Sequence, residues 1–142
     1  YYYASYPPEG YLKTADEKEH FRKQQGFLEA LEYKEGYTVK RFARKVRRTT
    51  CDHCKTETVF TVEKGVDSSI VADMMSLAWE DAYDIAILLS SDADIKPAVE
   101  HLKRFGKKVY HATFAKISKG TDLRKSCFGA IDLESLKDEI KR

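Results

Sequence analysis

The sequence predicts one α/β domain built on a mostly parallel sheet, and three observations support this prediction. At 142 residues, the chain is long enough for a single domain with its own hydrophobic core. A hydrophobic fraction of 42% and a charged fraction of 34% are typical of a globular protein. Over residues 67–133, helical and strand-like segments alternate with short connections, which is the pattern of a parallel sheet with helices on its faces.

The first half of the chain combines aromatic, charged and β-branched segments. Its apolar spacing and its turn residues predict six segments. They are a strand over 1–6, a turn over 7–10, a helix over 16–35 ended by Gly36, a strand over 37–46, a loop over 49–56 and a strand over 58–62.

The second half has clearer periodicity. Apolar residues at helical spacing follow Asp67, which occupies the position of an N-cap, and Trp79 in the same helix fits core packing. The near-continuous apolar run over 84–89 predicts a strand that is buried on both faces. The expected elements are a helix over 67–82, a strand over 84–89, a helix over 97–105, a strand over 109–114, a short helix near 123, a short strand over 130–133 and a terminal helix.

Charge and cysteine content narrow the class of protein. A net charge of +2 creates no overall field that would draw the chain to nucleic acid or to an anionic membrane. No apolar run approaches the roughly 20 residues of a membrane span, and the sequence does not open with the pattern of a signal peptide. Three cysteines, an odd number, argue against a disulfide framework and for a reducing compartment. The expected location is therefore the cytoplasm.

Two aspartates follow the apolar strand in the segment "ILLSSDADI". In parallel sheets, ligands bind outside the carboxyl ends of the strands, where Asp92 and Asp94 are expected to lie. Two neighbouring carboxylates repel each other unless a cation neutralises them, and Mg²⁺ or Mn²⁺ suits such oxygen ligands. Asp67 is expected to face the same edge, whereas Asp73 lies about 240° further around the helix. The alternative is structural: the aspartates form a turn, and Asp94 and Asp67 cap helices.

Three segments together carry a family resemblance: "EKGVDSSIVADMM", "AYDIAILLSSDADIKPAVEHLKRFGKKVYHATF" and "SKGTDLRKSCFGAIDL". In this order they resemble the NYN (LabA-like) branch of the PIN-like ribonuclease superfamily. The matching features are a Lys-Gly-Val-Asp entry to a helix, a hydrophobic strand ending in Ser-x-Asp-x-Asp, a Pro-containing helix ending in Phe-Gly-Lys-Lys-Val, and a late Ser followed by Leu. The resemblance covers residues 63–133 well and the first strand and helix more loosely.

The resemblance implies a three-layer α/β/α domain that binds Mg²⁺ or Mn²⁺ through acidic side chains and hydrolyses RNA phosphodiester bonds. The metal would polarise a phosphoryl oxygen and lower the pKa of a bound water molecule. The implied catalytic and metal-binding residues are Asp67, Asp92 and Asp94, with Asp73 as a further ligand. The implied pocket-lining residues are Lys64, Ser90 and Ser91. Many PIN-like domains form dimers, so the resemblance also leaves a homodimer open.

Two departures from the family pattern keep a second function open. Family members usually begin with a strand that ends in an aspartate ligand, whereas this sequence starts at the equivalent of the second strand. Where many members carry a late acid, this chain has Ser126, Cys127 and Phe128. We expect residues 1–142 to form one NYN domain without its first strand. The alternative to a ribonuclease is a catalytically weak RNA-binding or regulatory module, and a third hypothesis is a Toprim-like phosphotransfer domain.

The segment "VKRFARKVRR", residues 39–48, places six cations in ten positions. One interpretation is a surface that contacts RNA phosphates without reading the bases. The other is a solvated edge strand whose charges prevent aggregation. The cations are Lys40, Arg41, Arg44, Lys45, Arg47 and Arg48.

Cysteine and histidine residues offer weaker signals. In "CDHC", Cys51 and Cys54 supply half of the four ligands that a structural zinc site needs, and no second pair follows. An ordinary loop is therefore favoured over zinc binding or a redox-active pair. His101 and His111 are each isolated, and neither is expected to be catalytic.

Overall fold

The computed structural model describes residues 1–114 and 121–140, so the start of the segment "SKGTDL" lies outside the described residues. The chain divides into two compact units, Tyr1–Val66 and Asp67–Arg142. Parallel strands with helical connections occur in both. The α/β class that the sequence predicts is therefore confirmed. Within the described residues, no helix has the length and apolar character needed to cross a membrane.

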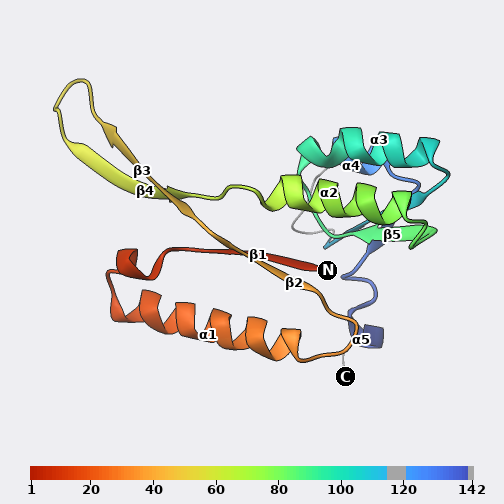
Figure 1. The fold of residues 1–142 in the computed structure, drawn as a ribbon, viewed down its shortest axis with the longest axis horizontal. Coiled ribbons are helices and arrows are strands. Elements are labelled where there is room, and N and C mark those ends of the chain that lie inside the picture. The colour runs from red at the N-terminus through yellow and green to blue at the C-terminus, as the bar shows by residue number, and fades with distance from the viewer. Residues whose placement is uncertain (115–120, 141–142) are drawn as a thin grey trace. The chain divides into compact units, whose positions relative to one another are not determined.

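The first unit is built around a β-α-β arrangement (Figure 1). Strand β1 (Tyr2–Tyr6) pairs in parallel with β2 (Val39–Ala43), and the 3-10 turn η1 (Glu9–Tyr11) and helix α1 (Ala15–Glu32) connect them. Parallel strands need such a crossover, because a tight turn reverses the direction of the chain and can join only antiparallel strands.

Helix α1 begins and ends through local sequence signals. Thr14 and Glu17 form a capping box, in which each side chain accepts a hydrogen bond from the other residue's backbone N–H. Leu28 and Leu31 are buried, while most of the charged residues are exposed. Gly36 follows with a φ of +81°, a conformation that glycine adopts without strain. The helix expected over 16–35 is confirmed, although it ends three residues earlier, at Glu32.

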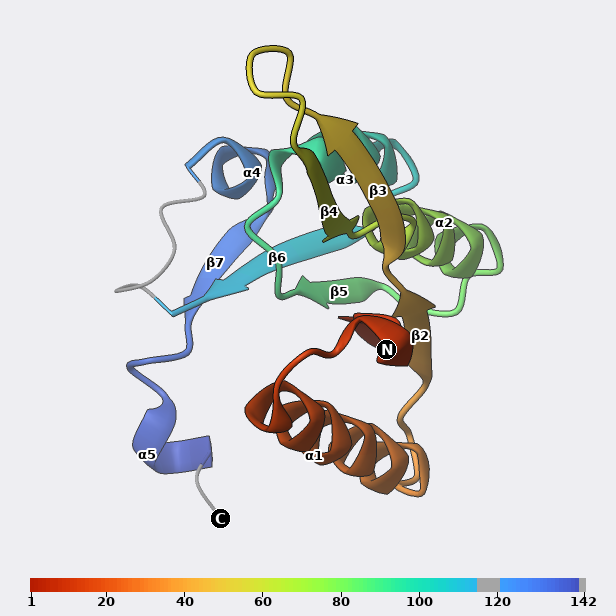
Figure 2. The same ribbon diagram turned by 90° about the vertical axis from the view of Figure 1, so that its left-hand side faces the viewer.

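The single strand expected over 37–46 is wrong, because the chain changes partner in the middle of it. The backbone N–H of Arg44 donates to the Tyr6 carbonyl at 2.9 Å, which closes the β1–β2 pairing. A new strand, β3 (Lys45–Thr50), then pairs antiparallel with β4 (Glu57–Val62) in a hairpin (Figure 2). The loop expected over 49–56 is correspondingly shorter, since residues 49 and 50 join the ladder.

The second unit contains a three-stranded parallel sheet in the order β5-β6-β7. Helix α3 packs on β6 and α4, and α2 contributes to the same core. The elements are α2 (Val66–Trp79), β5 (Ile85–Leu88), η2 (Ala93–Ile95), α3 (Lys96–Arg104), β6 (Lys108–Thr113), α4 (Thr121–Ser126), β7 (Gly129–Asp132) and α5 (Lys137–Ile140).

Helix α2 differs from its prediction at both ends. It begins at Val66, so Asp67 lies in its first turn and is not the N-cap. It ends at Trp79 and not at 82, because Asp81 adopts a positive φ of 54° that a helix cannot contain. The buried Lys107 then forms ion pairs with Asp81 and Asp84, which hold the connection from α2 to β5.

The core of the second unit lies between α2, α3 and one face of the sheet. Ile95, Val99 and Leu102 are fully buried there. Strand β5 was expected to be buried on both faces, and this is wrong: Leu88 is 8% exposed, but Ile85 is 54% and Ile87 65% exposed. Alternate residues of a strand face opposite sides, and the cluster around Leu88 covers only one of them.

Candidate functional site

The turn that follows β5 holds the predicted aspartates, and we call residues 90–94 the acidic turn. The backbone N–H of Asp92 donates to the Ser90 hydroxyl at 3.2 Å. The Asp92 carboxylate in turn accepts from the Asp94 N–H at 2.8 Å and caps η2. The structural alternative placed a cap at Asp94, whereas the structure assigns the cap to Asp92. The turn is therefore held by its own side chains.

The Asp94 carboxylate differs from that of Asp92 in having no hydrogen-bond or ion-pair partner among the described residues. Asp94 is also exposed. Mg²⁺ retains several waters and is commonly held by only one or two carboxylates. The donor set of the acidic turn therefore fits a hydrated Mg²⁺ or Mn²⁺, which the Asp94 carboxylate would bind.

His111 on β6 contacts the backbone of the acidic turn. Its Nε2 lies 2.6 Å from the Ser90 carbonyl oxygen, and its side chain is only 1% exposed. Because a carbonyl can only accept, Nε2 carries the proton and donates it. Nδ1 is buried and has no partner among the described residues. His111 was not expected to be catalytic, although its position in a strand next to the aspartate-bearing strand was a signal for a role in this turn.

The other two predicted ligands lie on α2. Asp67 and Asp73 are six residues apart, so they point about 240° apart around the helix. Across residues 1–114 and 121–140, no three His, Cys, Asp or Glu side chains gather closely enough to hold a metal ion. The structure brings Asp92 and Asp94 together but does not assemble the four predicted carboxylates into one cluster.

Asp132, which was not among the predicted site residues, ends β7 at the same edge of the sheet. Its carboxylate accepts a hydrogen bond from the Glu134 N–H at 3.0 Å, and Ser135 donates to its carbonyl. Strand β6 lies between Asp132 and the acidic turn, a separation of about 10 Å at ordinary strand spacing. These contacts make Asp132 a turn residue.

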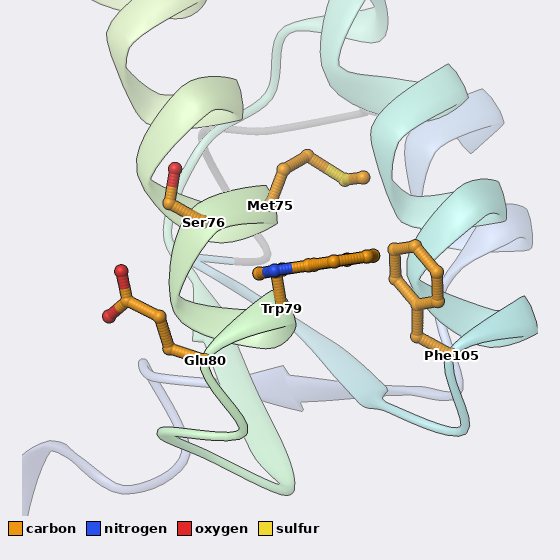
Figure 3. Close-up of a pocket in the computed structure, with 5 residues that line it drawn as sticks. All are labelled: Met75, Ser76, Trp79, Glu80 and Phe105. Carbon is orange, nitrogen blue, oxygen red and sulfur yellow. The ribbon is translucent and has the colours of Figure 1, made fainter.

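A surface hollow of about 320 Å³ lies between the C-terminal ends of α2 and α3 (Figure 3). It is lined by Met75, Ser76, Trp79, Glu80 and Phe105. Trp79 was expected in the core, but it is 81% exposed and packs edge-on against Phe105, with 6.4 Å between ring centroids. Ala78, the preceding residue of α2, is buried in the core, so Trp79 lies on a different face of the last turn.

The comparisons with known proteins agree with this architecture. The family model described as the NYN domain matches residues 2–134. The chain belongs to the NYN family. A crystal structure of a protein of unknown function from Vibrio parahaemolyticus RIMD 2210633 is similar, with a TM-score of 0.51 and 17% sequence identity. That similarity covers 92% of this chain and 67% of the other, and it concerns the fold alone. No curated protein matches the chain.

Membership of the NYN family relates the chain to the PIN-like nucleases and indicates a nuclease-like, RNA-related function. The suspected NYN resemblance is thereby confirmed.

The six cations of residues 39–48 differ in their surroundings. Arg41 donates to both carboxylate oxygens of Glu32 at 2.9 and 2.7 Å and so ties β2 to α1. Arg44 donates to Ser5, whose hydroxyl also contacts Glu63. These two arginines therefore help to hold the first unit together. Lys40 is half-buried on β2, and the remaining three cations lie on the hairpin.

The loop of the hairpin contains two free, exposed cysteines. Cys54 Sγ lies 3.2 Å from the Thr56 hydroxyl oxygen. Hydrogen bonds from the side chain and backbone of Thr56, followed by one from Cys51, lower the pKa of the Cys54 thiol to about 7. The third cysteine, Cys127, is buried, and burial raises its pKa. Cys54 is therefore the more nucleophilic of these two thiols at neutral pH.

Iodoacetamide should alkylate Cys54 with a rate that rises as the pH increases and reaches half its maximum near pH 7. The reason is that the thiolate is the reacting form. Thr56→Val, which removes the hydroxyl, should move this midpoint to higher pH. Peptide mass spectrometry would measure the rates, with Cys127 in the folded protein as the slow internal reference. A midpoint that Thr56→Val leaves unchanged would contradict the assignment.

Proposed function

We propose that this NYN domain is a metal-dependent endoribonuclease that hydrolyses RNA phosphodiester bonds at the acidic turn. The observation that carries the proposal is the open Asp94 carboxylate beside Asp92 at the carboxyl end of a parallel strand. Ligand sites of parallel sheets lie at this edge. The family match spans both compact units, which supports treating them as one NYN domain.

In this proposal, each residue of the acidic turn has a separate task. Asp94 binds the metal directly, and Asp92 adds a second carboxylate while it keeps the Asp94 backbone in place. Ser90 orients Asp92, and His111 holds the Ser90 carbonyl. Bound Mg²⁺ or Mn²⁺ would supply Lewis-acid polarisation of a phosphoryl oxygen and a water of lowered pKa. Asp67, Asp73, Lys64 and Ser91 stay predictions that rest on the family resemblance.

A second candidate is a catalytically weak module that binds RNA on the same fold. It is favoured by the absence of a three-ligand cluster within the described residues. It is also favoured by Ser126 and Cys127. Both are buried, and they stand where the family pattern has an acidic residue. We place either activity in the cytoplasm, on the basis of three free cysteines, and a homodimer is part of the same proposal.

Cleavage of labelled single-stranded RNA separates the two candidates. The purified protein should cut the RNA when Mn²⁺ is added and should stop cutting it when EDTA removes the metal. Double-stranded RNA of the same sequence would serve as a second substrate. Binding without cleavage at any Mn²⁺ concentration would overturn the nuclease proposal and leave the RNA-binding module.

A further inference from the structure

The β3–β4 hairpin presents two different faces. Directly paired residues of antiparallel strands point to the same side, and neighbours along a strand point to opposite sides. Arg47 is paired with Phe60, and Arg48 is paired with Val59. We call the side of Lys45, Arg47, Thr49, Thr58, Phe60 and Val62 the Phe60 face. The Val59 face consists of Val46, Arg48, Thr50, Glu57, Val59 and Thr61.

The two faces differ in how their cations are paired. On the Val59 face, Arg48 lies 3.7 Å from the Glu57 carboxylate, so part of its charge is neutralised within the hairpin. On the Phe60 face, neither Lys45 nor Arg47 has an ion-pair or hydrogen-bond partner among the described residues. Both cations are exposed. The unpaired positive charge of the ribbon therefore belongs to one side.

The same side carries an exposed aromatic ring. Phe60 is 44% exposed, although a phenylalanine ring is among the groups that most favour burial. Residues 47–60 are all exposed, so the hairpin is a two-stranded ribbon in solvent, and Figures 1 and 2 show it extending beyond β1 and α1 of its unit. Phe60 lies directly across from Arg47 and diagonal to Lys45 on this face. Proteins that bind single-stranded nucleic acids combine such groups, since the ring stacks on a base while the cations bind phosphates.

We propose that the Phe60 face binds single-stranded RNA, with Phe60 stacking on a base and with Lys45 and Arg47 contacting the phosphates next to it. This inference rests on the proposed function for the choice of RNA as the ligand. Double-stranded RNA is a poorer ligand for this face, because its bases are stacked on one another and offer no free face to Phe60. The hairpin then holds the substrate, and the acidic turn is a separate chemical site.

The two cross-strand pairs allow each variant of the Phe60 face to be compared with a matched variant of the Val59 face. Phe60→Ala should weaken binding of a labelled oligouridine about 5- to 100-fold. Arg47→Ala should also lower the slope of log K against log salt by about 0.7. Val59→Ala and Arg48→Ala, on the same strands but on the opposite face, should leave affinity and slope close to those of the wild type. Fluorescence anisotropy in EDTA would measure binding without cleavage.

A conservative variant protects the test against loss of the hairpin. Phe60→Leu keeps an apolar strand residue but removes the aromatic ring, so it should lose nearly as much affinity as Phe60→Ala, with an unchanged circular dichroism spectrum. The inference would be overturned if variants of the two faces lost equal affinity or if Phe60→Leu bound like the wild type. It would also be overturned if double-stranded RNA bound equally well or if the wild type bound no RNA.

The proposed nuclease function is tested independently. It fails if the protein still binds RNA but shows no Mn²⁺-dependent cleavage. In that case, face-selective loss of binding would still support the inference. Cleavage that persists together with wild-type binding by the Phe60-face variants would reject the inference alone.

Discussion

Asp94→Asn should reduce Mn²⁺-dependent RNA cleavage by roughly 100-fold or more, because it removes the negative charge of the open ligand in the acidic turn. The substitution keeps the shape of the side chain. It also leaves the Asp94 backbone N–H donating to Asp92, so the turn should stay folded. The free energy of unfolding should change by less than about 0.5 kcal/mol, as is usual for an exposed side chain. Initial cleavage rates over a range of Mn²⁺ concentrations would measure the effect.

Three further variants test whether the loss of cleavage results from lost metal binding. Asp92→Asn retains an oxygen that accepts from the Asp94 N–H, so it removes charge but keeps the cap on η2. It should therefore lower cleavage without unfolding the turn, whereas Asp92→Ala should affect both. Glu100→Gln removes one charge from an exposed position of α3 and serves as the control. Wild-type cleavage by Asp94→Asn would remove the acidic turn from the mechanism.

His111→Ala should lower the free energy of unfolding by about 1–3 kcal/mol, because it leaves the Ser90 carbonyl without its donor. The imidazole is buried, so its removal also opens a cavity in the second unit. Displacement of Ser90 should carry Asp92 out of position, and cleavage should fall together with stability. Urea unfolding followed by circular dichroism would measure the change in stability.

His101→Ala is the matched control, since His101 is exposed on α3 and contacts only the Phe105 ring among the described residues. It should leave the urea midpoint almost unchanged. If His111→Ala unfolds at the same urea concentration as His101→Ala, the hydrogen bond to Ser90 contributes nothing to the turn.

Local patterns were sufficient for the elements whose signals lie within one segment. The helix expected over 97–105 is found at Lys96–Arg104, with Ala98, Val99 and Leu102 buried as their spacing predicts. The hairpin was harder to predict, because residues 37–50 read as one strand followed by a loop. Its division at Arg44 depends on two different partners: β1, which precedes α1 in the chain, and β4, the strand that follows β3.

The α/β class, the NYN resemblance and the position of two aspartates after an apolar strand all follow from the sequence alone. These features depend on apolar periodicity and on short motifs, which the order of residues contains directly. The tertiary structure was needed to show that Asp92 caps η2, that the Asp94 carboxylate has no partner among the described residues, and that His111 contacts the Ser90 carbonyl. It also distinguished Arg47 from its neighbour Arg48. Such differences arise from strand register and from contacts between distant residues, because a shift of one residue turns a side chain to the opposite face.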